Sequence, residues 1–250
     1  MNQAVVEMRQ TWDESFEAQI ASGAYNTSPV EAVVRTVAYY LRARFVPADY
    51  RSLHFLDLGC GAGPNMLWLA EKGFKASGID ISPNALRLAR DAFEHHQLGD
   101  RLGELCEGSV TELPFADGSL DGAVEACVFQ HLDLENRKRA FSEVSRVLKP
   151  GGVFVGYMLS VSHSIFLQQQ DHQCPEDPGT VALNTDGGSK FHLGNIGLSH
   201  FFTRAEFETL LPNWSTVDPC ENGYDIPREE AVRRGYERYH QGMWTVYAVK

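Results

Sequence analysis

The chain has 250 residues, of which 43% are hydrophobic, so it is long enough for one large domain or two small ones around a sizeable core. Its formal net charge of −11 argues against an extended electrostatic interaction with nucleic acid, which requires clustered lysine and arginine. The one dense basic run, Arg137-Lys138-Arg139, falls in a helical pattern and is interpreted as a solvated helix face.

Neither the amino-terminal residues nor the cysteines indicate an exported or membrane protein. The chain lacks a basic start followed by an apolar segment, and no apolar run approaches the length of a membrane span. We therefore expect no signal peptide and no membrane association. The five cysteines form no CxxC pair, and we expect them to be reduced and mostly buried, which is typical of a cytoplasmic protein.

Helical and strand patterns alternate along the chain as far as residue 159. Apolar residues recur at helical spacing over about residues 10–46, where Ser28-Pro29 marks an expected helix start. Strands are predicted at 53–58, 75–80, 102–106, 121–128 and 153–159, and helices at 64–72, 83–96 and 134–148. This alternation predicts an α/β fold, in which helices cover both faces of a parallel sheet and right-handed crossovers join the strands.

The regular alternation ends after Ser160. Residues 160–200 form a long polar stretch, and loops of this length in compact domains tend to be functional lids or insertions. Beyond it, Thr203 and Glu206 have the spacing of a capping box. The last predicted elements are helices at 203–211 and 228–239 and strands at 215–219 and 243–249.

The segment Phe55–Gly63 is the most informative part of the sequence. Apolar residues lead to Asp57, and glycines follow at positions 59, 61 and 63. Glycine permits the positive φ angles of a tight turn and the close approach of a ligand, and open α/β sheets bind ligands at the carboxyl ends of their strands. A dinucleotide-binding turn requires glycine or alanine where this chain has Pro64, which disfavours a nicotinamide oxidoreductase.

The G-x-G-x-G turn, with an acid two residues before it, resembles motif I of the class I S-adenosylmethionine-dependent methyltransferases. The resemblance covers about residues 53–159. Its further motifs are Gly78-Ile79-Asp80-Ile81-Ser82, the segment 107–115, Gln130-His131-Leu132 and the segment 146–152.

This resemblance implies a Rossmann-like, seven-stranded, mostly parallel sheet with helices on both faces, N-terminal helices and a lid insertion after strand five. It also implies a single domain over residues 1–250. Within it we expect a helical lid at 1–50, a cofactor-binding core at 51–159, a substrate or lid insertion at 160–200 and the last strands at 201–250.

The same resemblance implies residues that bind S-adenosylmethionine. Asp80 would hold the ribose hydroxyls, because a carboxylate accepts two hydrogen bonds, and Ile81 would lie against the adenine. The family commonly has Asp where this chain has Ser109. The adenine amino group would therefore meet either Ser109, beside Val110, or the nearby Glu107.

Two further positions extend this set. Asp57 would help to place the methionine end of the cofactor, or would orient the turn through backbone amides. Tyr25, in a polar loop, is a better candidate to cover the cofactor than Trp12 and Phe16, for which ordinary helix packing is the preferred interpretation. The expected cofactor-binding residues are Tyr25, Asp57, Gly59, Gly61, Asp80, Ile81, Ser109, Val110 and Glu125.

The sequence does not identify a catalytic base. His131 follows the fourth predicted strand, and we favour a structural role for it. Several histidines and a cysteine lie in or beside the insertion, but their spacing fits no zinc pattern, so no metal is expected. These residues are His163, His172, Cys174, His192 and His200.

The favoured hypothesis is a methyltransferase that acts on an N, O or C atom of a small molecule, as a monomer or homodimer. A nucleic-acid methyltransferase is a weaker alternative, since Glu125-Ala126-Cys127-Val128 stands where amino-methylating members have a proline-containing motif. A non-catalytic S-adenosylmethionine-binding partner protein is a third hypothesis.

Overall fold

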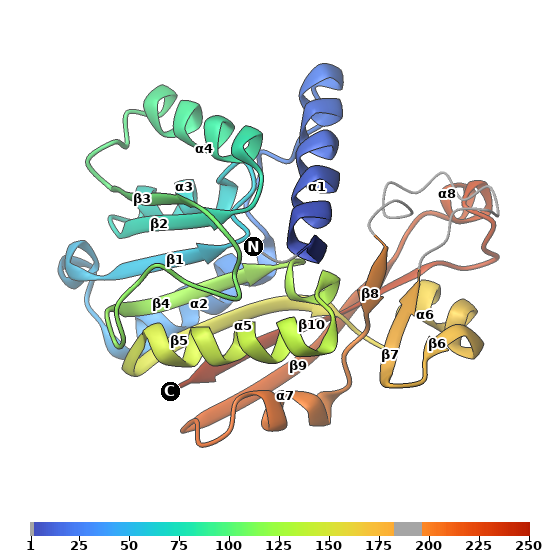
Figure 1. The fold of residues 1–250 in the computed structure, drawn as a ribbon. Coiled ribbons are helices and arrows are strands. Elements are labelled where there is room, and N and C mark those ends of the chain that lie inside the picture. Colours follow the sequence, from blue (N-terminus) through green and yellow to red (C-terminus); the bar gives the residue numbers. More distant parts are fainter. Residues whose placement is uncertain (1–2, 183–196) are drawn as a thin grey trace.

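A computed structural model describes residues 3–182 and 197–250, which contain a central seven-stranded sheet (Figure 1). The strand order is β3-β2-β1-β4-β5-β10-β9. The strands are β1 (His54–Leu58), β2 (Lys75–Asp80), β3 (Leu102–Glu107), β4 (Leu120–Ala126), β5 (Leu148–Leu159), β9 (Thr216–Asp225) and β10 (His240–Val249). The first five are mutually parallel, and β10 runs antiparallel to both of its neighbours. The predicted Rossmann-like, mostly parallel sheet is therefore confirmed.

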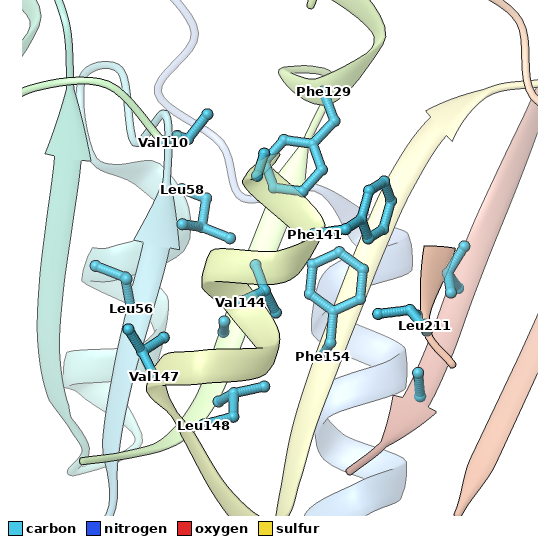
Figure 2. Packing of buried hydrophobic residues seen from close by; sticks show 14 of the residues in the cluster. Leu56, Leu58, Val110, Phe129, Phe141, Val144, Val147, Leu148, Phe154 and Leu211 are labelled. Atoms are coloured by element: carbon cyan, nitrogen blue, oxygen red, sulfur yellow. The ribbon is translucent and has the colours of Figure 1, made fainter. Parts of the chain in front are cut away.

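Helices cover both faces of this sheet. One face packs against α2 (Glu31–Arg44), α3 (Pro64–Glu71) and α4 (Pro83–His95), and the other against α5 (Leu134–Val147) and α7 (Arg204–Leu210). Alternation along β1 divides its side chains between the faces, since Phe55 packs with α2 and α3 whereas Leu56 and Leu58 pack with α5. Figure 2 shows Phe141 of α5 beside Phe154 of β5, with ring centroids 5.8 Å apart.

Most helix starts follow from local chemistry. Ser82 caps α4, because its Oγ accepts a hydrogen bond from the Ala85 N–H and Pro83 occupies the first turn, as predicted. The predicted start of α2 at Ser28-Pro29 is too early, since the helix begins at Glu31 after Val30. The helix α8 (Arg228–Arg233) is shorter than predicted and is followed by Gly235, whose φ of +83° does not continue a helix.

The segment after β5 is more regular than its polar composition suggests. Its described part contains α6 (Ser164–Gln169), η3 (Gln170–His172) and a three-stranded antiparallel sheet of β6 (Gln173–Cys174), β7 (Asp177–Ala182) and β8 (Leu198–His200). We call these strands the insertion sheet. Residues 183–196 of the predicted insertion, including His192, lie outside the described residues.

A buried polar network ties the insertion sheet to the main domain. Arg137 of α5 donates a 2.6 Å hydrogen bond to Asp177 of β7, and Thr180 contacts both Asp177 and His200. The other ring nitrogen of His200 lies 2.9 Å from Glu206 of α7. The prediction of a solvated face for Arg137 is therefore wrong, because its side chain is only 1% exposed.

Two other expectations concern the cysteines and the membrane. All five cysteines are free, but only Cys60 is buried, Cys220 is exposed and the rest are intermediate, so the expectation that most are buried is wrong. Among the described residues, no helix combines the length and the apolar character needed to cross a membrane.

The ion pair between Arg137 and Asp177 gives a prediction for stability. Replacing Arg137 with Met leaves Asp177 buried without its charged partner, so the free energy of unfolding should fall by about 3–5 kcal/mol. Urea unfolding measures this loss. The matched control is Lys138→Met, whose exposed pair with Glu135 should contribute no more than about 0.5 kcal/mol. Equal losses in the two variants would contradict the structural role of Arg137.

Candidate functional site

The turn after β1 has the backbone geometry that its glycines predict. Gly59, Gly61 and Gly63 have φ angles of +69°, +53° and +81°. The N–H groups of Gly59 and Cys60 both donate to the carbonyl of Ile79, which fastens the turn to the end of β2. A Cβ atom on Gly59 would overlap the side chain of Val128, so glycine is required there for space as well as for φ.

A cavity of about 260 Å³ opens at this turn, at the carboxyl ends of the parallel strands. Its floor includes six of the nine predicted cofactor-binding residues. These are Gly59, Gly61, Asp80, Ile81, Ser109 and Val110. The remaining wall is mostly apolar and comes from α1 (Gln3–Ser22), from the last residue of β4 and from the segment that follows it. Its residues are Met8, Trp12, Phe16, Ala126, Cys127, Val128, His131 and Leu132, and Gly108 completes the lining.

Asp80 connects the end of β2 to the glycine turn. Its Oδ2 accepts a 2.8 Å hydrogen bond from the Gly61 N–H, and its Oδ1 accepts a 2.9 Å bond from the Ser82 N–H. Burial raises the pKa of Asp80, and the backbone donors at Ser82 and Gly61 oppose that rise. Each carboxylate oxygen has a further lone pair, so Asp80 can accept additional hydroxyl donors from the cavity.

Two of the predicted residues, Asp57 and Glu125, are buried near the carboxyl ends of β1 and β4 and do not line the cavity. Glu125 Oε1 accepts hydrogen bonds from the N–H groups of Val128 and Phe129, so this side chain orders the segment after β4. Burial raises the pKa of Asp57 and the pKa of Glu125 to about 7. Each carboxylate also has one buried oxygen without a hydrogen-bond partner among the described residues.

The adenine-side candidates differ in their surroundings. Ser109 lines the cavity, and its Oγ lies 2.8 Å from Oγ1 of Thr111 and accepts from the Thr111 N–H. Glu107, the alternative, does not line the cavity and forms an ion pair with Arg9 of α1. Of the two, Ser109 is therefore the side chain that a ligand in the cavity meets.

Helix α1 stands beside the carboxyl ends of β1 and β4 (Figure 1). It is fastened by Asp13, whose carboxylate accepts bonds from Ser82 Oγ, at 2.6 Å, and from the backbone and side-chain nitrogens of Asn84. An acid at the start of α4 also interacts favourably with the helix dipole. These contacts hold α1 over the cavity.

The aromatic residues that line the cavity differ from the one expected from the sequence. Trp12 and Phe16, interpreted there as ordinary packing residues, line the cavity, and Phe16 lies 3.3 Å from the position of a Cβ on Gly61. Tyr25 lines a separate hollow with Pro64 of α3 and His95 of α4. The helical spacing of Trp12 and Phe16, at i and i+4, is the sequence signal that puts them on one face.

His131 lines the cavity from η2 (Phe129–His131), the short helix that follows β4. Its ring meets that of Trp12 edge-on, with centroids 5.5 Å apart. Burial lowers the pKa of His131 to about 4, and a hydrogen bond with the Leu198 backbone only partly offsets this. Within the described residues, no group of three His, Cys, Asp or Glu side chains is arranged to hold a metal ion.

The neighbouring Cys127 adopts a conformation that is uncommon for a residue with a side chain. Its φ is +63°, in the left-handed region, and its N–H donates to the carbonyl of Tyr157 on β5. This turn directs the chain from the end of β4 across the cavity toward His131.

A glycine turn, a buried acid at the end of the next strand and a cavity above both define a class I Rossmann-like fold that binds a nucleoside cofactor. Comparisons with known proteins identify a domain family over the part of the chain that contains these features. Residues 56–156 match the family described as "Methyltransferase domain". The matched region is thus a methyltransferase domain of the S-adenosylmethionine-dependent type, and S-adenosylmethionine is its cofactor.

Individual relatives agree with this assignment. Sterol 4-C-methyltransferase strm-1 of Caenorhabditis elegans is 31% identical over 121 residues, which cover 48% of this chain and 35% of the relative. A structure of an S-adenosylmethionine-dependent methyltransferase from Methanosarcina mazei has 26% identity and a TM-score of 0.59, covering 78% of this chain and 91% of that one.

A third relative contributes evidence on the fold alone. Burkholderia thailandensis 1,6-didemethyltoxoflavin-N1-methyltransferase, solved with its substrate and S-adenosylhomocysteine, superposes with a TM-score of 0.57 at 18% identity, covering 100% of this chain and 92% of that chain. The chain spans less than half the length of the curated relatives it matches, such as the sterol enzyme.

The glycine turn gives a prediction with a matched control. Gly61 and Gly118 both have positive φ, so replacing either with Ala should cost about 1–2 kcal/mol of folding stability. Only the Gly61 Cβ meets Phe16 and enters the cavity, whereas a Cβ on Gly118 meets no atom within 4 Å. Calorimetry should therefore show at least about tenfold weaker binding of S-adenosylhomocysteine to Gly61→Ala only. Equal affinities would contradict the position of the cofactor.

The buried Glu125 carboxyl gives a prediction for pH dependence. Its folded pKa of about 7 lies above the ordinary value of 4.5, so the native state binds more protons and loses stability as pH rises from about 4.5 to 7. Glu125→Gln removes this loss. Relative to the wild type, the variant should gain about 3 kcal/mol of unfolding free energy between pH 4.5 and pH 8.

Urea unfolding at several pH values measures the gain. Glu112→Gln, a change of the same chemistry at an exposed side chain, is the control and should follow the wild type across the range. A pH-independent difference between Glu125→Gln and the wild type would show that the Glu125 carboxyl ionises normally.

Proposed function

We propose that this protein transfers a methyl group from S-adenosylmethionine to an N, O or C atom of a small molecule. The observation that carries the proposal is the cavity in which the glycine turn and the Asp80 carboxylate face an apolar wall from α1 and the segment after β4. The first two features suit a methyl donor, and the apolar wall is the surface that an acceptor would meet.

The chemistry of the cavity residues fits the donor. Asp80 accepts hydrogen bonds from the ribose hydroxyls through the lone pairs that its backbone donors leave free. Ile81 and Val110 supply apolar contacts to the adenine, and the Ser109 hydroxyl bonds its polar edge. Gly59 and Gly61 let the backbone approach the methionine end closely. Asp57 does not contact the donor in the cavity. It orders the start of α3 through hydrogen bonds with the Asn65 side chain and the Met66 backbone.

The protein's main contribution to the reaction is positioning and the exclusion of water. S-adenosylmethionine supplies an electrophilic methyl group, which an acceptor atom takes by in-line displacement while the bonding electron pair stays on sulfur. Holding two reactants in line can supply about 7–11 kcal/mol of the barrier. The apolar side chains of Met8, Trp12 and Phe16 cover the reacting groups and exclude water from them.

Three features favour a small acceptor over a nucleic acid. The chain carries a net charge of −11, and apolar side chains, rather than lysine or arginine, surround the cavity. The similar proteins described above include enzymes whose names specify a sterol and a toxoflavin precursor. Helix α1 also supplies Met8, Trp12 and Phe16 to the cavity wall, where a polynucleotide would need an open groove.

A direct test uses purified full-length protein. Calorimetry with S-adenosylhomocysteine measures cofactor binding, and incubation of the protein with S-adenosylmethionine and a metabolite panel, followed by mass spectrometry, reports products heavier by one methylene. We expect both binding and at least one methylated small molecule. Methylation of tRNA or rRNA but of no metabolite would overturn the proposed acceptor class, and failure to bind the cofactor would overturn the proposal entirely.

Asp80→Asn tests the donor site by itself. The Asn side chain keeps one oxygen that can accept from a backbone N–H but loses the negative charge. Affinity for S-adenosylhomocysteine should therefore fall about 10- to 100-fold, ~1.5–3 kcal/mol. Asp121→Asn is the control, because Asp121 bonds His54 and Lys149 at the amino end of β4, away from the cavity. Unchanged affinity in Asp80→Asn would show that the ribose binds elsewhere.

A further inference from the structure

We propose that Asp13 is a positioning residue of this site and that its carboxylate is a latch. It holds α1 over the cavity, and its release lets S-adenosylmethionine enter and the product leave. This inference rests on the proposed function, because it places the cofactor in the cavity. It follows from the size of the cavity, from two rows of side chains on α1 and from the chain that follows the helix.

The cavity is too small for the proposed reaction while α1 stays where it is. Its volume is about 260 Å³, whereas sites that hold one drug-sized ligand have volumes of roughly 300–1,000 Å³. Methyl transfer brings two molecules together. The floor lies on hydrogen-bonded strands of the sheet, and Glu125 orders the segment after β4. The part of the wall that can move to admit both molecules is therefore α1.

Two rows of side chains run along α1, one residue apart. The row that lines the cavity consists of Met8, Trp12 and Phe16. The row that binds the end of β3 and the start of α4 consists of Arg9, Asp13 and Glu17. Each residue of the second row directly follows one of the first, so a movement that breaks the second row's bonds also withdraws the first row from the cavity.

Asp13 makes the strongest contacts of the second row. Its Oδ1 accepts bonds from Ser82 Oγ at 2.6 Å and from the Asn84 N–H at 3.1 Å, and its Oδ2 accepts from the Asn84 side chain at 3.1 Å. Hydrogen bonds to a charged acceptor are stronger than those to a neutral one. The pair of Arg9 and Glu107 is 38% and 45% exposed, and exposed pairs contribute little. Loss of the Asp13 bonds should therefore release the helix.

The chain that follows α1 provides a hinge. Gly23 has a φ of +65°, and a Cβ atom there would meet no atom within 4 Å, so the surroundings leave its backbone free to turn. The chain is fixed again at Val30, whose N–H donates a 3.0 Å bond to Asn65 Oδ1 of α3. Helix α1 can thus swing as one body about residues 23–29 while α2 stays in place.

The position of the latch determines how it affects binding. Asp13, Ser82 and Asn84 are not among the described residues that line the cavity, so a cofactor in the cavity does not touch them. The latch therefore stabilises the closed helix to a similar extent with and without cofactor. Its loss should accelerate entry and release together and leave the affinity nearly unchanged. A residue that only supported the shape of the site would change the affinity instead.

Release of tritium-labelled S-adenosylhomocysteine tests the latch. Loaded protein is mixed with excess unlabelled compound, rapid filtration follows the label that stays bound, and calorimetry gives the affinity. Asp13→Ala should release the label at least about tenfold faster, with an affinity within about threefold of the wild type. Glu14→Ala removes the same charge from an exposed position on the same helix and should behave as the wild type. Unchanged release from Asp13→Ala, or an affinity that falls as steeply as release accelerates, would overturn the proposal.

A second pair of variants tests the contact without truncating a side chain. Asn84→Asp sets a carboxylate against that of Asp13, so repulsion should open the latch and accelerate release at least about tenfold. An acid in the first turn of α4 is itself favourable for that helix. Adding Asp13→Asn restores a donor and an acceptor in exchanged positions, and should return release to within about threefold of the wild type. Slow release from Asn84→Asp, or fast release from the double variant, would contradict the latch.

Fluorine NMR of protein labelled with 5-fluorotryptophan reports on α1 without any ligand. In Asn84→Asp the Trp12 resonance, assigned from Trp12→Phe, should move toward that of free 5-fluorotryptophan, and it should return in the double variant. The resonance of Trp244, which is buried in the core, should stay in place. An unmoved Trp12 resonance would show that α1 stays shut. Failure of the proposed function is a different outcome, in which the wild type would not bind S-adenosylhomocysteine while this resonance still reported the latch.

Discussion

The hydrogen bond from the Gly61 N–H to the Asp80 carboxylate is the interaction on which the site depends. It joins the turn after β1 to the end of β2, so two strands that are adjacent in the sheet also present their ends in one fixed arrangement. Because Asp80 also accepts from the Ser82 N–H, the same carboxylate sets the start of α4. One buried acid thus organises the turn, the helix and the polar floor of the cavity.

Helix α1 is built onto this arrangement through a second acid. Asp13 binds Ser82 and Asn84 at the start of α4, and its charge contributes to the raised pKa of Asp80. The two carboxylates therefore repel each other across the same helix start. Under the proposed function, hydroxyl donors from the cofactor on Asp80 would offset that repulsion.

The parts of the molecule that could be predicted from sequence are those determined locally. The sheet, the glycine turn and the position of Asp80 follow from short patterns within single elements. The cavity wall from Trp12 and Phe16 could not be predicted, because the periodicity of a helix identifies a face but not its partner in space. Arg137 was misjudged for the same reason: its partner Asp177 lies 40 residues away, in a strand of only six residues.

In the described part of the chain, Asp13 and Arg9 fasten α1 to the core, whereas Arg137, His200 and an apolar cluster that includes Val181 and Phe201 fasten the insertion sheet. The glycine turn and Asp80, by contrast, belong to the strands of the sheet itself. Under the proposed function, the apolar wall from α1 and the strand ends that hold the donor thus come from different parts of the sequence. Under the proposed function, a change of side chains on this wall would alter the choice of acceptor and leave the bond between Gly61 and Asp80 in place.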